Sequence, residues 1–174
     1  MSSIALDFRV RYMVIDFSML KLIPVLVPKP LWGINAHDLL AWETWQRIRR
    51  DTFAQDNHLC VICEQQLPLE CHEVFSYDDT AGIAVLEKLE SRCTDCHACN
   101  HLGRLRKRNP DKFRHALFRI GRLNKMKPEE VVLLVKEAFR LHSTRTKSWE
   151  LKVSPDLLRS YPELARLEGR HEVT

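Results

Sequence analysis

Two Cys-x-x-Cys pairs carry the strongest chemical signal in this sequence. Cys60 and Cys63 form the first pair, Cys93 and Cys96 form the second, and 29 residues separate them. Two residues between cysteines let both sulfurs reach one ion from a tight turn, and two such turns complete the tetrahedral four-thiolate shell that zinc favours. We therefore expect a structural Zn²⁺ ion at these four cysteines, contributing on the order of 10 kcal/mol to folding.

Disulfide bonds are the alternative for the paired cysteines. No apolar run is long enough to span a membrane, and the apolar N-terminal stretch is interrupted by charges, unlike a signal peptide. A cytoplasmic location is therefore predicted, where thiols more often bind metal than pair with each other. The two remaining cysteines, Cys71 and Cys99, lack the spacing of a zinc pair and are expected to be small buried side chains.

A second group of metal-binding and acid–base residues surrounds the second cysteine pair. His72 and Glu73 are adjacent in a strand predicted over about 68–75, so their side chains point to opposite faces. His97 and His101 are four residues apart in a predicted helix and share one face. If zinc brings the strand and the helix together, His72 or Glu73 can meet both histidines and form a site for a divalent ion. Each residue alone is more often an ordinary surface side chain; the combination indicates a site.

Basic residues are concentrated just after the second cysteine pair. The formal net charge is only +4, but residues 104–127 contain ten Lys or Arg and a single acidic residue, Asp111. Such clustering is typical of nucleic-acid-binding proteins, although a solvated helix face has the same composition. The residues predicted to contact a phosphate backbone are Arg104, Arg106, Lys107, Arg108, Lys112 and Arg114.

The rest of the chain is expected to supply an α+β framework for these residues. Segments 4–16 and 21–27 are rich in apolar and β-branched residues and predict an N-terminal β-hairpin. Asn35 predicts the start of a helix over about 36–54, and Pro128 predicts the start of another. The predicted organisation is an extension at 1–34, a core at 35–125, and a helix, a strand and a polar tail at 126–174.

The combined motifs resemble the HNH endonucleases, and in particular a bacterial and phage subgroup of them. The resemblance rests on the order Cys-x-x-Cys, a histidine in a strand, and Cys-x-x-Cys-His, and on the stretches VPKPLW, WETWQRIRR, CHEVFSYDD and EEVVLLVKEAF. It covers about residues 25–153. It implies a zinc-stabilised ββα-metal, treble-clef-like core with flanking helices, in which a hairpin and a helix hold one divalent ion, Mg²⁺, Mn²⁺ or another transition metal.

The resemblance also implies roles for individual residues. His97 directly follows the second cysteine pair, where the family has a metal ligand, and His101 is a further candidate ligand. In the family, a metal ligand directly precedes the general base, and apolar residues follow the base. If Val74 is the first of these apolar residues, Glu73 is the base and His72 is the ligand. A shift by one residue makes His72 the base. The central asparagine of the family is absent here, and Lys88 stands near its place.

Three functions are compatible with these features. The first is a metal-dependent HNH endonuclease that hydrolyses phosphodiester bonds in nucleic acid, most simply DNA, either as a monomer or as a homodimer. The second is a zinc-stabilised nucleic-acid-binding module that does not cleave. The third is a protein-interaction domain that uses Trp42, Trp45 or the helix near 128–142, although these side chains are more often core. A ligand set of histidines favours Mn²⁺, Ni²⁺ or Zn²⁺ over Mg²⁺.

Overall fold

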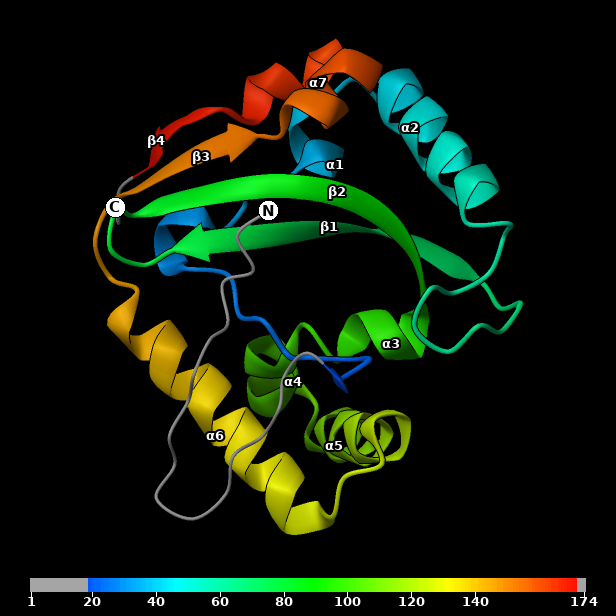
Figure 1. Cartoon of the computed structure of the whole chain (residues 1–174), viewed down its shortest axis with the longest axis vertical. Coiled ribbons are helices and arrows are strands. Elements are labelled where there is room, and N and C mark those ends of the chain that lie inside the picture. Colours follow the sequence, from blue (N-terminus) through cyan, green and yellow to red (C-terminus); the bar gives the residue numbers. More distant parts are fainter. Residues whose placement is uncertain (1–18, 172–174) are drawn as a thin grey trace.

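A long β-hairpin runs through the centre of the molecule (Figure 1). It consists of β1 (Leu69–Asp78) and β2 (Ile83–Cys93), which pair antiparallel. In the computed structural model, which describes residues 19–171, the hairpin belongs to a four-stranded sheet of order β1-β2-β3-β4. Strand β3 (Trp149–Val153) pairs in parallel with β2, and β4 (Gly169–His171) pairs antiparallel with β3. The predicted α+β class is confirmed.

Two residues shape the turn between β1 and β2. The Asp78 carboxylate accepts hydrogen bonds from the backbone N–H groups of Thr80 and Ala81, both at 2.9 Å. Gly82 has a φ of +71°, and a Cβ atom there would lie 3.0 Å from the carbonyl oxygen of Ser148. Glycine therefore allows both the left-handed backbone and the close approach of the chain leading into β3.

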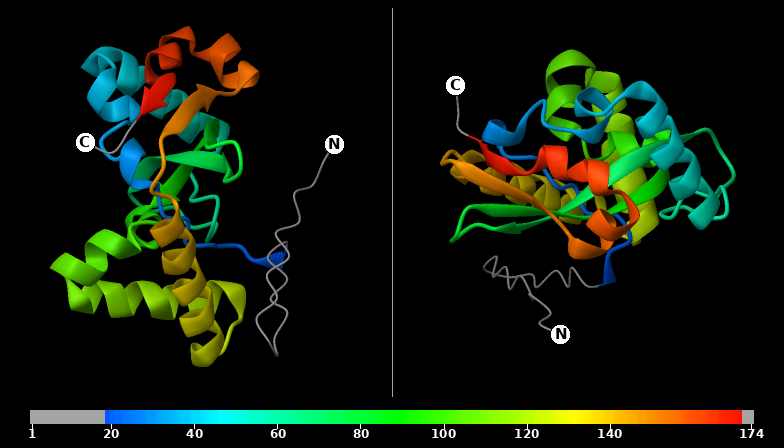
Figure 2. Two further views of the ribbon diagram at one scale, coloured as in Figure 1. Left: turned by 90° about the vertical axis from the view of Figure 1, so that its left-hand side faces the viewer. Right: turned by 90° about the horizontal axis from the view of Figure 1, so that it is seen from above.

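Helices cover the sheet in two groups (Figures 1 and 2). One group consists of α1 (Ala36–Leu39), α2 (Trp42–Gln55), α7 (Pro155–Ser160) and the 3₁₀ helix η3 (Pro162–Leu167). The other consists of α3 (Thr94–Ala98), α4 (Leu102–Arg108), α5 (Pro110–Asn124) and α6 (Pro128–Thr144). A short 3₁₀ helix, η2 (Lys29–Leu31), precedes α1 and buries Leu31 in the core of the first group. Each group has its own buried core, one around Trp149, Ile48 and Leu164, the other around Leu22, Leu102 and Ile120. The hairpin lies between them.

Both long helices of the second group begin at a proline, and the start of α6 at Pro128 is the one that the sequence predicts. The Asn109 side chain accepts the N–H of Lys112 at 2.9 Å, and Pro110 occupies the first helical position of α5. Helix α6 begins at Pro128, and the Glu130 carboxylate accepts the N–H of Lys127 at 2.6 Å. These contacts satisfy backbone donors that have no partner within the helix.

The strand predicted over 21–27 is wrong, and the segment predicted to pair with it, 4–16, lies outside the described residues. Residues 21–27 are extended and bury alternate side chains, including Leu22 and Leu26, which is why they mimic a strand in sequence. Their backbone is bound instead by a side chain: the Asn124 amide accepts the N–H of Leu22 at 3.0 Å and donates to its carbonyl at 2.7 Å.

One further prediction needs correction and another can be refined. The helix predicted over 36–54 is divided, because Leu40 adopts an extended backbone and is buried in the core, so α1 ends at Leu39 and α2 begins at Trp42. The predicted polar tail forms regular secondary structure as far as residue 171. Leu164 and Leu167 are fully buried in η3, and β4 extends the sheet.

Among the described residues, no helix combines the length and the apolar character needed to cross a lipid bilayer.

Candidate metal centres

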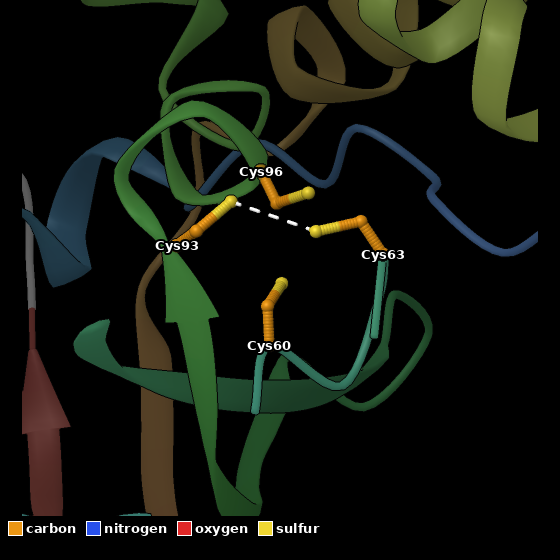
Figure 3. A group of neighbouring side chains, drawn as sticks. All are labelled: Cys60, Cys63, Cys93 and Cys96. Atoms are coloured by element: carbon orange, nitrogen blue, oxygen red, sulfur yellow. Dashed lines mark hydrogen bonds between the residues drawn. The ribbon is translucent and has the colours of Figure 1, made fainter. Parts of the chain in front are cut away.

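The four cysteines predicted to bind zinc converge on one point (Figure 3). Their sulfur atoms all lie within 4.8 Å of one another, although Cys60 and Cys63 precede β1 whereas Cys93 ends β2 and Cys96 lies in α3. The sulfurs of Cys63 and Cys93 are 3.8 Å apart. Bonds of about 2.3 Å in tetrahedral geometry place two sulfurs about 3.8 Å apart. The four cysteines can therefore hold a metal ion such as zinc.

Backbone hydrogen bonds shape the first cysteine turn and attach it to the hairpin. The N–H of Glu64 donates to the carbonyl of Cys60 at 2.7 Å, and the N–H of Val61 donates to Ser91 of β2 at 2.9 Å. Burial acts to raise the pKa of the Cys60 thiol, but backbone N–H groups of Cys93, Cys63 and Ile62 outweigh it and lower the pKa to about 7. These donors favour the thiolate that a metal requires.

A positive charge lies directly against the cysteine cluster. Arg119 of α5 donates one hydrogen bond from Nε to the sulfur of Cys96, at 3.2 Å, and one from a terminal nitrogen to the sulfur of Cys93, at 3.3 Å. A zinc ion with four thiolates carries a net negative charge, and a guanidinium group in this position stabilises it. As expected, Cys71 and Cys99 lie outside the cluster, and burial raises the pKa of each to about 12.

The histidines of the second predicted site also come together. The Nε2 atoms of His97 and His101 are 3.1 Å apart, and the ring of His72 lies 5.0 Å from that of His97, centre to centre. With metal–nitrogen bonds of about 2.1 Å, a separation of 3.1 Å corresponds to an N–metal–N angle of about 95°. At this distance the two nitrogens share a hydrogen bond, and loss of its proton would leave both free to bind one ion.

Glu70 completes the histidine group and was missed in the sequence. Its carboxylate contacts Nδ1 of His97, which leaves Nε2 to face His101. A carboxylate behind a histidine fixes the ring and the tautomer at many metal sites. The alternation of β1 was the available signal, since Glu70 and His72 are two residues apart and share a face.

Arg92 and Asn100 form the polar surroundings of these histidines, and neither was predicted. Arg92 lies opposite Glu70 in the hairpin, is 8% exposed, and donates to Glu90 and, at 2.6 Å, to the Asn100 side chain. With burial, its charge lowers the pKa of His72 to about 2. A cavity of about 210 Å³ is lined by His72, Arg92, Asn100 and His101, by residues of segment 20–27, and by further residues of β1, namely Glu73, Val74, Phe75 and Tyr77.

The structure does not bring Glu73 to the histidines. Its side chain points to the opposite face of β1, where the carboxylate accepts the N–H of Ala36 at 2.6 Å. Burial there raises the pKa of Glu73 to about 7. Lys88, which stands near the place of the family's asparagine, pairs with Glu90 at 2.7 Å.

The predicted phosphate-contacting residues lie on two consecutive helices. His101 immediately precedes α4, so the basic segment starts at the histidine group. Within α5, Arg114 is paired with Asp111. All six predicted side chains are exposed: Arg104, Arg106, Lys107 and Arg108 on α4, and Lys112 and Arg114 on α5.

Comparisons with known proteins gave no match to this chain. No family model matches the chain, and no match was found among curated proteins or solved structures.

Proposed function

We propose that this protein is a metal-dependent nuclease of the HNH type, with structural zinc at the four cysteines and an exchangeable divalent ion at His97 and His101. The observation that carries the proposal is the 3.1 Å approach of the two Nε2 atoms, with the Glu70 carboxylate behind His97. Neutral imidazoles in this arrangement suit Mn²⁺ or Ni²⁺ better than Mg²⁺. The hairpin and α3, joined at the cysteine cluster, are consistent with a ββα-metal core.

His72 is the residue of the group that we propose to activate water, and because burial and Arg92 hold its pKa at about 2, this role requires a bound phosphate to raise that pKa. It shares the β1 face with Glu70, and its ring lies beside that of His97. Glu73, the other predicted base, lies on the far side of the strand. A bound ion supplies polarisation of the phosphate and stabilises the charge on the leaving oxygen. Arg92, buried beside His72, adds a positive charge on the same face.

The exposed basic residues of α4 and α5 indicate the class of substrate on which the proposed nuclease would act. Helix α4 starts next to His101 and presents Arg104, Lys107 and Arg108 to solvent. Lys and Arg side chains on such a surface bind phosphates without reading base sequence. We therefore propose nucleic acid, most simply DNA, as the substrate.

Cleavage of plasmid DNA tests the proposal. Purified protein is incubated with Mg²⁺, Mn²⁺, Ni²⁺ or EDTA, beside the variants His97→Ala and His37→Ala. His37 is an exposed histidine on α1, apart from the site, and serves as the matched control. We expect nicking that is strongest with Mn²⁺ or Ni²⁺, unchanged in His37→Ala and reduced at least about 100-fold in His97→Ala. A plasmid and a single-stranded DNA circle that both stay intact with every metal contradict the nuclease.

A non-cleaving nucleic-acid-binding module is the second candidate. The observation that favours it is the position of Glu73, since one of the two predicted catalytic residues is absent from the histidine group. This candidate predicts salt-sensitive binding of nucleic acid with no cleavage in any divalent metal.

A further inference from the structure

Trp32 is exposed to solvent and yet held in place. It directly follows η2, and its side chain is 58% exposed. Its indole N–H donates to the carbonyl of Val27 at 2.9 Å. The indole also stacks on the ring of His142 in α6, with centres 5.9 Å apart and planes 14° apart. Two contacts thus fix the ring while leaving much of its surface open.

Positive charges surround this aromatic pair. Burial and nearby cations, among them Lys29 and Lys107, lower the pKa of His142. The lowered pKa favours the uncharged form of the imidazole that stacks on Trp32. Arg106 of α4 lies over Phe139, one helical turn before His142 on α6, with its guanidinium carbon 5.3 Å from the ring centre. Phe139 and His142 are three residues apart and share one face of α6, so the Trp32–His142 pair lies on the side of α6 that faces Arg106 of α4.

A rigid aromatic ring beside a basic helix matches the chemistry of a nucleic acid with unpaired bases. Such a base offers a flat face for stacking, and its phosphates are attracted by Lys and Arg. Bases within a duplex are already stacked on both faces and are not available to an external ring. A basic rim also disfavours a protein partner whose surface is positive.

We propose that Trp32 is a stacking platform for an unpaired base of the nucleic acid whose backbone lies along α4. The substrate class is then single-stranded or locally unpaired nucleic acid. This inference rests on the proposed function only in taking nucleic acid as the partner, and it holds whether or not the chain cleaves.

Trp42 provides a matched control within the chain. It is 61% exposed, nearly the same as Trp32, but it lies at the start of α2, next to Glu43. Its ring meets His37 edge-on rather than stacking. Replacing Trp42 therefore removes an equally exposed indole that does not border α4.

The test compares two oligonucleotides with equal numbers of phosphates, one an oligo-dT and the other an abasic strand of the same length. Binding is measured by fluorescence anisotropy at low salt, without added divalent metal and with the protein's zinc retained. We expect the wild type to bind oligo-dT about tenfold more tightly than the abasic strand. The preference is lost in Trp32→Ala, largely kept in Trp32→Phe and unchanged in Trp42→Ala, while binding to the abasic strand stays the same in all four proteins.

Three outcomes overturn the proposal. Equal binding of both strands by the wild type excludes stacking but keeps nucleic acid as the partner. A Trp32→Ala variant that loses affinity for both strands equally shows a structural role for the indole. If the wild type binds neither strand, nucleic acid itself is the wrong partner, and the proposed function fails together with this inference.

Discussion

The cysteine and histidine clusters are neighbours on the same hairpin and helix, with Cys96 belonging to one and His97 to the other. The cysteine cluster is closed. It brings four ligand atoms within 4.8 Å of one another, three of its members are buried, and Arg119 contacts two sulfurs. The histidine cluster is open. It brings two ring nitrogens together at 3.1 Å, His101 is exposed, and a cavity lies alongside.

This difference corresponds to the general distinction between structural and catalytic metal sites. Structural zinc is enclosed by four protein ligands, whereas a catalytic ion keeps positions open for water or substrate. The histidine cluster brings only two ring nitrogens together, so an ion bound there would keep coordination positions open for water or substrate. Under the proposed function, the cysteine cluster would hold a structural ion and the histidine cluster an exchangeable one.

The largest effect is expected from breaking the closed cluster. Cys96→Ser removes one of four thiolates, and the loss of a structural ion worth on the order of 10 kcal/mol matches the whole stability of a typical domain. We expect less than one zinc per chain by elemental analysis and loss of cooperative unfolding by circular dichroism.

Cys71→Ser is the control for this variant, because Cys71 lies outside the cluster. It should keep one zinc and a cooperative transition. A Cys96→Ser variant that retains stoichiometric zinc and wild-type stability would contradict the structural role.

The His72→Ala variant tests whether His72 acts as the general base or as a metal ligand in the histidine cluster. As the group that activates water, His72 should contribute about 10²- to 10⁴-fold to the cleavage rate while leaving the affinity for Mn²⁺ within about threefold of wild type. Single-turnover cleavage and calorimetric Mn²⁺ titration measure the two effects separately. A loss of Mn²⁺ affinity equal to that of His97→Ala would instead make His72 a ligand.

Glu70→Gln is expected to have an intermediate effect. It leaves an acceptor for Nδ1 of His97 but removes the charge that orients and polarises the ring, so the affinity for Mn²⁺ should fall about 10- to 100-fold. Glu87→Gln, an exposed position on β2, is the control. Unchanged Mn²⁺ binding in Glu70→Gln would show that the carboxylate has no part in the site.

The smallest effect is expected from Glu73→Gln. Its carboxylate binds the Ala36 N–H on the far face of β1, and a glutamine oxygen can accept the same bond. The cleavage rate should stay within about threefold of wild type, measured on the same plasmid substrate. A loss of 100-fold or more would restore Glu73 as the general base.

The parts predicted from sequence are those specified by local spacing. Cys-x-x-Cys turns and the four-residue interval between His97 and His101 determine their own geometry, and strand alternation alone placed His72 and Glu73 on opposite faces. The roles of Glu70 and Arg92 depend on the register of the hairpin, where these two residues lie opposite each other. That register could not be predicted because β2 was not recognised as a strand.

Non-local pairing explains the errors in the fold as well. Residues 21–27 have the alternation of a strand, but their backbone partner is a side chain about 100 positions away, Asn124. The last strand, β4, has only three residues and pairs with β3. Neither Asn124 nor β3 can be identified as the partner from the sequence pattern of the segment that it binds.

The most direct test of the central distinction is a calorimetric titration of Mn²⁺ into the zinc-retaining protein, in the wild type and in His97→Ala. We predict one Mn²⁺ site in the wild type, its loss in His97→Ala, and one zinc per chain before and after titration in both proteins. Two results would contradict the distinction between a closed and an open site: Mn²⁺ that displaces zinc from the cysteines, or wild-type Mn²⁺ binding in His97→Ala.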